Sequence, residues 1–228
     1  MRVTREALRQ IRRRHFGYRI TLVTQLLLLV LLPLAQRVPW LLSLLLCQLA
    51  LVQVVFLSRF SLQRRSKPLI YGLGGLAIAM ELLWHGALIL VPSLGRLLTF
   101  PHVLVWLLFL LTGVFRKVLA LICEPFVTVS VVLGAASGYF TLGIAGGVLF
   151  TALWVLQPSA FVAAALPPMV AAQPPTMAAA PALMAAVFGV LTTLGSAQVA
   201  AACLTIAGQL FVVILIGLVL GRVRRNLL

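Results

Sequence analysis

The chain has 228 residues, of which 63% are hydrophobic and only 9% are charged. This composition excludes an ordinary water-soluble domain of the same length and is typical of a polytopic membrane protein. Eighteen lysines and arginines against three acidic residues give a net charge of +15, but nucleic-acid binding is not indicated, because the basic residues cluster beside apolar runs, where they mark cytoplasmic segments and contacts with anionic membrane lipids.

The scarcity of acidic residues also limits the chemistry that the chain could perform. They are Glu6, Glu81 and Glu124, and the chain has no aspartate. Catalysis by paired carboxylates and carboxylate-rich metal sites are therefore nearly excluded. The three histidines and three cysteines lie on different segments without ligand spacing. We expect no enzyme activity, no metal and no cofactor.

The N-terminal segment, residues 1–19, carries seven arginines. Apolar residues such as Leu8, Ile11 and Phe16 are interspersed among them. This pattern predicts a partly helical basic segment that lies on the cytoplasmic leaflet. A solvated positive tail that only fixes the topology is an equally good interpretation.

A four-helix membrane domain is predicted over residues 20–123. Because the connection Arg37-Val38-Pro39 is very short, the first two helices should form an antiparallel hairpin. A basic loop at 58–68 and a short loop at 92–98 should precede the third and fourth helices. Arg116 and Lys117 are expected just beyond the fourth. The apolar runs place these helices at about 18–35, 40–57, 69–91 and 100–114.

The third predicted helix carries a pair of ionisable residues. Glu81 and His85 are four residues apart and therefore share one helix face. An intramembrane carboxylate with a histidine one turn away could be a proton or ion site. The interpretation that we favour is a mutually hydrogen-bonded pair near the outer interface.

A second unit is predicted over residues 124–225. Its first helix is rich in glycine, and the spacing of Gly134 and Gly138, and of Gly143 and Gly147, should let other helices approach closely. A short apolar half-helix that ends in a polar stretch predicts a re-entrant loop. The expected parts are an outer helix at 126–156, a Pro/Ala-rich outer loop at 157–181, a half-helix and loop at 182–198, and an inner helix at 199–221.

The predicted architecture is therefore all-α, with six transmembrane helices and a re-entrant half-helix between the fifth and sixth. Sixteen of the eighteen lysines and arginines then fall on one side of the membrane, whereas Arg37 and Arg96 fall on the other. By the positive-inside rule both termini are expected in the cytoplasm and the re-entrant loop at the outer side.

Several short pieces of the second unit form a recognisable set. They are Val127-Thr128, Leu133-Gly134-Ala135, Tyr139, Leu142-Gly143, Gln157-Pro158-Ser159-Ala160-Phe161, Thr192-Thr193-Leu194-Gly195, Gly208-Gln209-Leu210-Phe211 and Leu215-Ile216. Through these pieces the second unit resembles the two-helix pore module of the potassium-channel superfamily. The whole chain is similar to bacterial and cyanobacterial ion-channel-family membrane proteins that place four helices before an outer helix, a pore loop and an inner helix.

The resemblance implies a selectivity filter at Thr192, Thr193, Leu194 and Gly195, with K⁺ as the permeant ion. It also assigns inner-helix packing or gating to Gly208, Gln209, Gly217 and Gly221. The chain departs from the family pattern Thr-x-Gly-Tyr-Gly-Asp after its first glycine, because Ser196, Ala197 and Gln198 follow. An alanine resists the backbone conformation that the second glycine permits, at a cost of about 1 kcal/mol or more per subunit.

Two functions follow from this departure and both stay open. One is a homotetrameric pore that conducts cations with reduced K⁺ selectivity, since such filters align the backbone carbonyls of four subunits. The other is a non-conducting relative that acts as a structural or assembly subunit of a larger membrane complex. The plasma membrane is the default location, and a photosynthetic membrane is the alternative.

Overall fold

The computed structural model describes residues 5–35, 38–60, 67–122, 128–161, 183–184, 187, 205, 208–209, 211–212 and 216–217. Five long helices and one short 3-10 turn make up most of this part of the chain. Their bounds are α1 (Arg5–Ala35), α2 (Pro39–Phe60), α3 (Lys67–Leu90), α4 (Pro92–Ile122), α5 (Val129–Leu156) and η2 (Pro158–Ala160).

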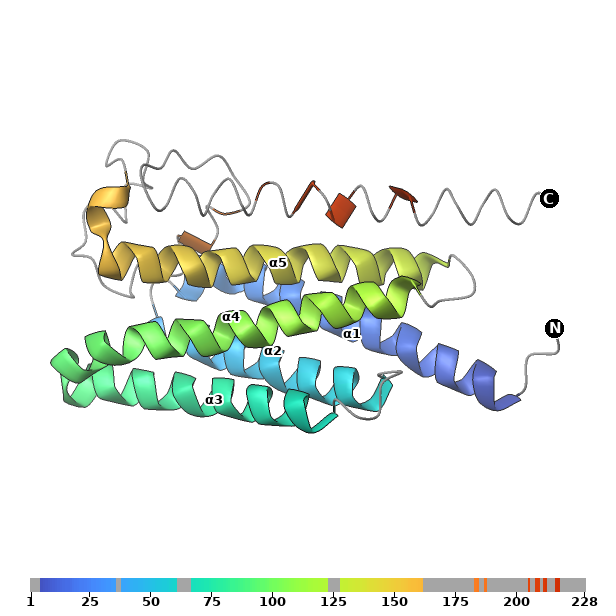
Figure 1. Ribbon diagram of the computed structural model, residues 1–228, viewed down its shortest axis with the longest axis horizontal. Helices are drawn as coiled ribbons and strands as arrows, with labels where there is room; N and C mark the ends of the chain where they lie inside the picture. Colours follow the sequence, from blue (N-terminus) through green and yellow to red (C-terminus); the bar gives the residue numbers. More distant parts are fainter. Residues whose placement is uncertain are drawn as a thin grey trace.

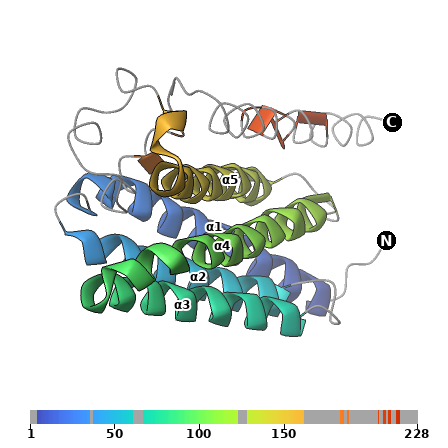
Figure 2. The same cartoon turned by 60° about the vertical axis from the view of Figure 1, so that its left-hand side comes forward.

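The five helices pack in a closed ring in which each helix has two main neighbours, and α2 also touches α4 across the ring (Figures 1 and 2). Sequence neighbours pack in the pairs α1–α2, α2–α3, α3–α4 and α4–α5, and α5 returns to α1. Each helix runs opposite to the one before it, so the start of α1 and the ends of α2 and α4 lie at one end of the bundle, at the right in Figure 1. We call this the basic end, because the arginine-rich start of α1 lies there.

The side chains of the bundle are distributed as expected for a protein in lipid. Large apolar residues such as Leu90, Leu97 and Phe100 are exposed on the outside. Polar residues from all five helices are buried inside, among them Gln25 and Glu81. Among the described residues, four helices are long and apolar enough to cross a membrane, and these spans are His15–Ala35, Lys67–Ala87, Ser93–Ile122 and Val129–Leu156. The apolar part of α2, Trp40–Phe56, is shorter. The long elements of the described chain are thus all helices, as in an integral membrane protein.

The predicted hairpin of the first two helices is confirmed. Only residues 36–38 separate α1 from α2, and the two helices pack against each other. The N–H of Val38 donates to the carbonyl of Leu34 at 3.1 Å, and the N–H of Leu41 donates to the carbonyl of Val38 at 3.0 Å. The α1 helix also continues through the basic segment, which supports its predicted partly helical character.

The fourth helix differs from its prediction at both ends. The prediction of a loop at 92–98 is wrong, because Val91 alone separates the end of α3 at Leu90 from the start of α4 at Pro92. Proline is favoured in the first helical position, and the carbonyl of Val91 accepts hydrogen bonds from Leu94 and Gly95 at 3.0 and 3.1 Å. At the other end α4 continues to Ile122, so Lys117 lies within the helix rather than beyond it.

The close helix approach predicted from the glycines of α5 is confirmed at Gly134, and two further glycines receive described residues of the C-terminal part. A Cβ atom on Gly134 would lie 2.8 Å from Cγ of Tyr18 on α1. One on Gly138 would lie 2.5 Å from Cζ of Phe211, and one on Gly147 would lie 2.8 Å from Cα of Met184. These glycines therefore seat α1 and two described residues of the C-terminal part directly on α5.

The end of α5 is fixed by aromatic contacts. The chain leaves the helix at Gln157, makes the turn η2, and returns Phe161 against α5. The ring of Phe161 meets those of Trp154 and Phe150 edge-on, with centroids 5.6 and 6.2 Å apart. The remainder of the predicted outer loop, the half-helix with its filter-like stretch, and the inner helix lie outside the described residues, apart from the isolated positions given above.

We expect Gly147→Ala to lower the free energy of unfolding by about 1–3 kcal/mol, because the added Cβ would overlap the backbone of Met184 as well as its side chain. Thermal unfolding in detergent measures the change. The matched control is Gly75→Ala on α3, whose Cβ meets nothing within 4 Å. That control should be neutral or slightly stabilising, and equal effects of the two substitutions would contradict the proposed contact.

Candidate functional site

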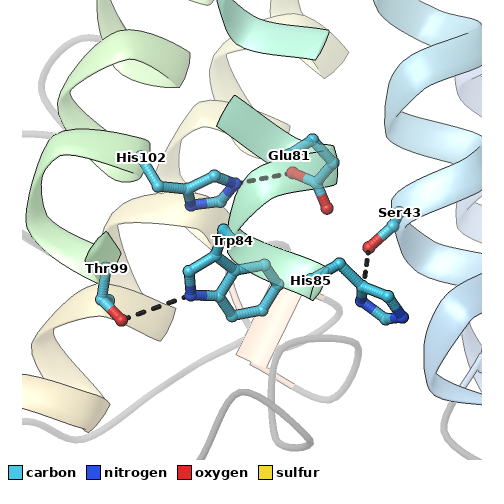
Figure 3. Close-up of polar contacts among 6 residues, drawn as sticks. All are labelled: Ser43, Glu81, Trp84, His85, Thr99 and His102. Carbon is cyan, nitrogen blue, oxygen red and sulfur yellow. Dashed lines mark hydrogen bonds and ion pairs between the residues drawn. The ribbon is translucent and has the colours of Figure 1, made fainter. Parts of the chain in front are cut away.

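The bundle holds two buried polar clusters, and the first lies between α3 and α4 (Figure 3). Nε2 of His102 lies 2.6 Å from Oε2 of Glu81, and the two side chains are 3% and 2% exposed. We call these residues, together with Trp84 and Thr99, the Glu81 cluster. A carboxylate beside an imidazole in an apolar bundle can hold a proton between the two groups.

The rest of this cluster orients the imidazole. The indole of Trp84 stacks on the His102 ring with a centroid distance of 4.8 Å and an interplanar angle of 21°. Its Nε1–H points to Oγ1 of Thr99 at 3.4 Å, and that hydroxyl donates to the carbonyl of Gly95 at 3.0 Å. Stacking on Trp84 therefore holds the His102 imidazole in the orientation in which its Nε2 contacts the carboxylate of Glu81.

The prediction that Glu81 is hydrogen-bonded to His85 is wrong, because the partner of Glu81 is His102. Glu81 turns to His102 on the neighbouring helix, and Nδ1 of His85 lies 3.3 Å from Oγ of Ser43 on α2. Residues four apart share a helix face, but Cβ atoms lean toward the helix N-terminus, and packing decides which neighbour each side chain meets. The mutual hydrogen bond that we favoured from the sequence is thus replaced by two contacts between helices.

His102 was missed as a site residue, although the sequence carries a signal for it. Glu81 lies ten residues before Val91, and His102 lies eleven residues after it. In an antiparallel hairpin with a one-residue connection, positions equally far from the turn lie at the same depth. The prediction of a loop at 92–98 hid this equivalence.

The second polar cluster joins α1, α4 and α5, and it consists of Gln25, Lys117, Ser137 and Thr141. Nζ of Lys117 donates to the hydroxyls of Ser137 and Thr141, both at 2.9 Å. Nε2 of Gln25 donates to Oγ1 of Thr141 at 2.6 Å. All four residues are buried, so in this Lys117 cluster a basic side chain is enclosed by protein and shielded from lipid.

The hydrogen bonds at Thr141 determine how this cluster is built. Its hydroxyl donates to the backbone carbonyl of Ser137 at 2.8 Å, so its oxygen acts toward Lys117 and Gln25 only as an acceptor. Both acceptor positions of the hydroxyl are then occupied. The amide oxygen Oε1 of Gln25 is buried without a hydrogen-bond partner.

A further cation lies closer to the basic end on the same α1–α5 interface. Nη2 of Arg19 donates to Oγ of Ser130 at 3.2 Å. Ser130 precedes Ser137 by seven residues, which is about 10 Å along the axis of α5. Arg19 is exposed, whereas Lys117 is buried. Along this interface one basic side chain therefore lies at the protein surface and the other lies inside the bundle.

The predicted pore residues are only partly within the described chain. The filter-like stretch Thr192–Gln198 and Gly221 lie outside it. Gly208 is buried, and a Cβ on it would lie 3.4 Å from Cε2 of Tyr139 on α5. Gln209 is exposed, and nothing lies within 4 Å of a Cβ on Gly217. An added Cβ on Gly208 would thus make only an ordinary van der Waals contact, and one on Gly217 would meet none of the described residues, so the roles assigned to these glycines stay predictions.

Within the part of the chain that the structure describes, no group of three or more His, Cys, Asp or Glu side chains could hold a metal ion. Comparisons with protein-family models, with curated proteins and with solved structures find no match for the chain.

We expect His102→Leu or Glu81→Leu alone to cost about 3–5 kcal/mol of stability, because each leaves the other member of the pair buried without its partner. The double substitution should cost less than the sum of the two, with a coupling of about 1–3 kcal/mol in thermal unfolding. His85→Leu is the control, since it removes the longer contact to Ser43 and a tilted ring contact with Trp84 but leaves the Glu81–His102 pair intact, and it should cost about 1 kcal/mol. If the stability losses of the two single substitutions simply add up in the double variant, the Glu81–His102 pair contributes no coupling energy.

Proposed function

We propose that the chain is a potassium-channel-like membrane protein in which α5 and the C-terminal segment form a cation-conducting pore module. In this proposal four copies assemble around one axis, because each chain supplies a single filter-like stretch. K⁺ is the proposed permeant ion, and the membrane lipids surround the helices α1–α4.

The observation that supports this function best is the seating of C-terminal residues on α5. Phe211 rests on Gly138, Gly208 approaches Tyr139, and Met184 rests on Gly147. An outer helix that receives an inner helix on a glycine face is what a two-helix pore module requires. Two of the three contacts, those of Phe211 and Gly208, involve residues by which the sequence resembles the channel superfamily, whereas Met184 and Gly147 lie outside the matching pieces.

The filter-like stretch sets the expected selectivity. Thr193 and Gly195 retain the first part of the family pattern, whereas Ser196 and Ala197 replace its tyrosine and second glycine. We infer a pore with weak discrimination between K⁺ and Na⁺, since fewer backbone carbonyls can be aligned to replace the hydration shell of the ion. The alternative that these substitutions favour is a non-conducting subunit of a larger membrane complex.

The basic end of the bundle is proposed to face the cytoplasm, together with both chain termini. On a background with Cys47, Cys123 and Cys203 changed to Ser, a cysteine at Ser66 should react with a membrane-impermeant maleimide only after the membrane is opened. A cysteine at Val38 should react in intact cells. The opposite labelling pattern would invert the topology, and labelling of both sites in intact cells would contradict a spanning hairpin.

Flux from liposomes tests the pore. We expect the purified protein to pass K⁺ and Na⁺ at similar rates, and the triple change Ser196→Tyr, Ala197→Gly and Gln198→Asp to raise the K⁺/Na⁺ ratio at least about tenfold, as a gain of roughly 1.4 kcal/mol in discrimination requires. Gly75→Ala serves as a folding-neutral control. Absence of flux in the wild type with flux in the triple variant would support the non-conducting alternative, and absence in both folded proteins would contradict the pore.

A further inference from the structure

Lys117 is the most unusual charge in the bundle, because its ammonium lies inside rather than at the interface. The residue is only five positions before the end of α4, about 8 Å along the helix axis. A lysine so close to a membrane interface normally extends its side chain toward water. Here the side chain instead reaches Ser137 and Thr141, which lie about 12 and 18 Å into α5 from its start at the same end.

The cluster leaves the positive charge of Lys117 uncompensated among the described residues. Its two acceptors are neutral hydroxyls. The chain has three acidic residues in all: Glu81 is bonded to His102, and Glu6 precedes Gln25 on α1 by nineteen residues, about 28 Å. Glu124 lies outside the described residues. A buried charge is costly unless it is paired.

Hydrogen-bonding capacity at the cluster is also unfilled. An ammonium has three donors, and Lys117 uses two of them on protein acceptors. The amide oxygen of Gln25 is buried and has no donor. A partly hydrated small anion matches this set, because the anion would accept from Lys117 while a water of its shell would donate to the amide oxygen.

We propose that the Lys117 cluster binds a small monovalent anion of the chloride type, which enters along the α1–α5 interface past Arg19. The ligand neutralises the ammonium of Lys117.

Thermal unfolding of the full chain in detergent tests the site, with chloride compared to gluconate at equal sodium concentration. We expect chloride to raise Tm saturably, by roughly 3–6 °C at ten times its Kd. Lys117→Met should abolish the difference between the two anions. Arg116→Met, a change of the adjacent cation on the same helix, should preserve it, so the two variants separate a specific site from general screening of positive charge.

A direct measurement keeps the test independent of folding. The broadening of the chloride NMR line by the protein should disappear in Lys117→Met. Equal Tm values in chloride and gluconate for the wild type would overturn the anion site. A chloride response that appears only in Glu124→Gln would also overturn it, by showing that Glu124 neutralises Lys117 within the chain.

Discussion

The structure depends on one constraint: polar side chains in lipid must find their partners inside the bundle. Each of the five long helices contributes buried polar residues, and the outer faces carry exposed apolar ones. In an apolar solvent an unsatisfied polar group costs several kcal/mol, so each such contact also fixes the rotation of its helix. The carboxylate of Glu81 sets α3 against α4, and the ammonium of Lys117 sets α4 against α5 and, through Thr141 and Gln25, against α1.

Close packing completes what these contacts begin. Leu28, Leu49, Trp106 and Ile144 come from four different helices and join one buried apolar core. The glycines of α5 serve a different purpose, since they let Tyr18, Phe211 and Met184 pack directly against the helix. The helix α5 therefore packs both against the other helices of the ring and against the described C-terminal residues. A change in its orientation would disturb the packing of both.

The two polar clusters differ in chemistry although both are buried. In the Glu81 cluster the charges of carboxylate and imidazole can compensate each other across 2.6 Å, with an indole stacked on the ring. In the Lys117 cluster the described partners are neutral hydroxyls, and an amide oxygen remains without a donor. The first arrangement pairs its two ionisable groups within the protein, although Nδ1 of His102 is buried without a hydrogen-bond partner, and we assign it to the stability and rotation of α3 and α4. The second has no acidic partner among the described residues, which is why we look there for a ligand.

The sequence alone determined that the chain lies in lipid, that it is helical, and where most of its helices begin and end, because long apolar runs suffice to predict membrane spans. It also predicted the hairpin at Val38 and the close contacts of the α5 glycines, since both depend on local spacing. The tertiary structure decided the partners. His102 replaced His85 beside Glu81, because this pairing depends on the register between α3 and α4, which the one-residue connection at Val91 fixed and the predicted loop had concealed. Lys117 turned inward because α4 continues past it to Ile122 and packs against α5.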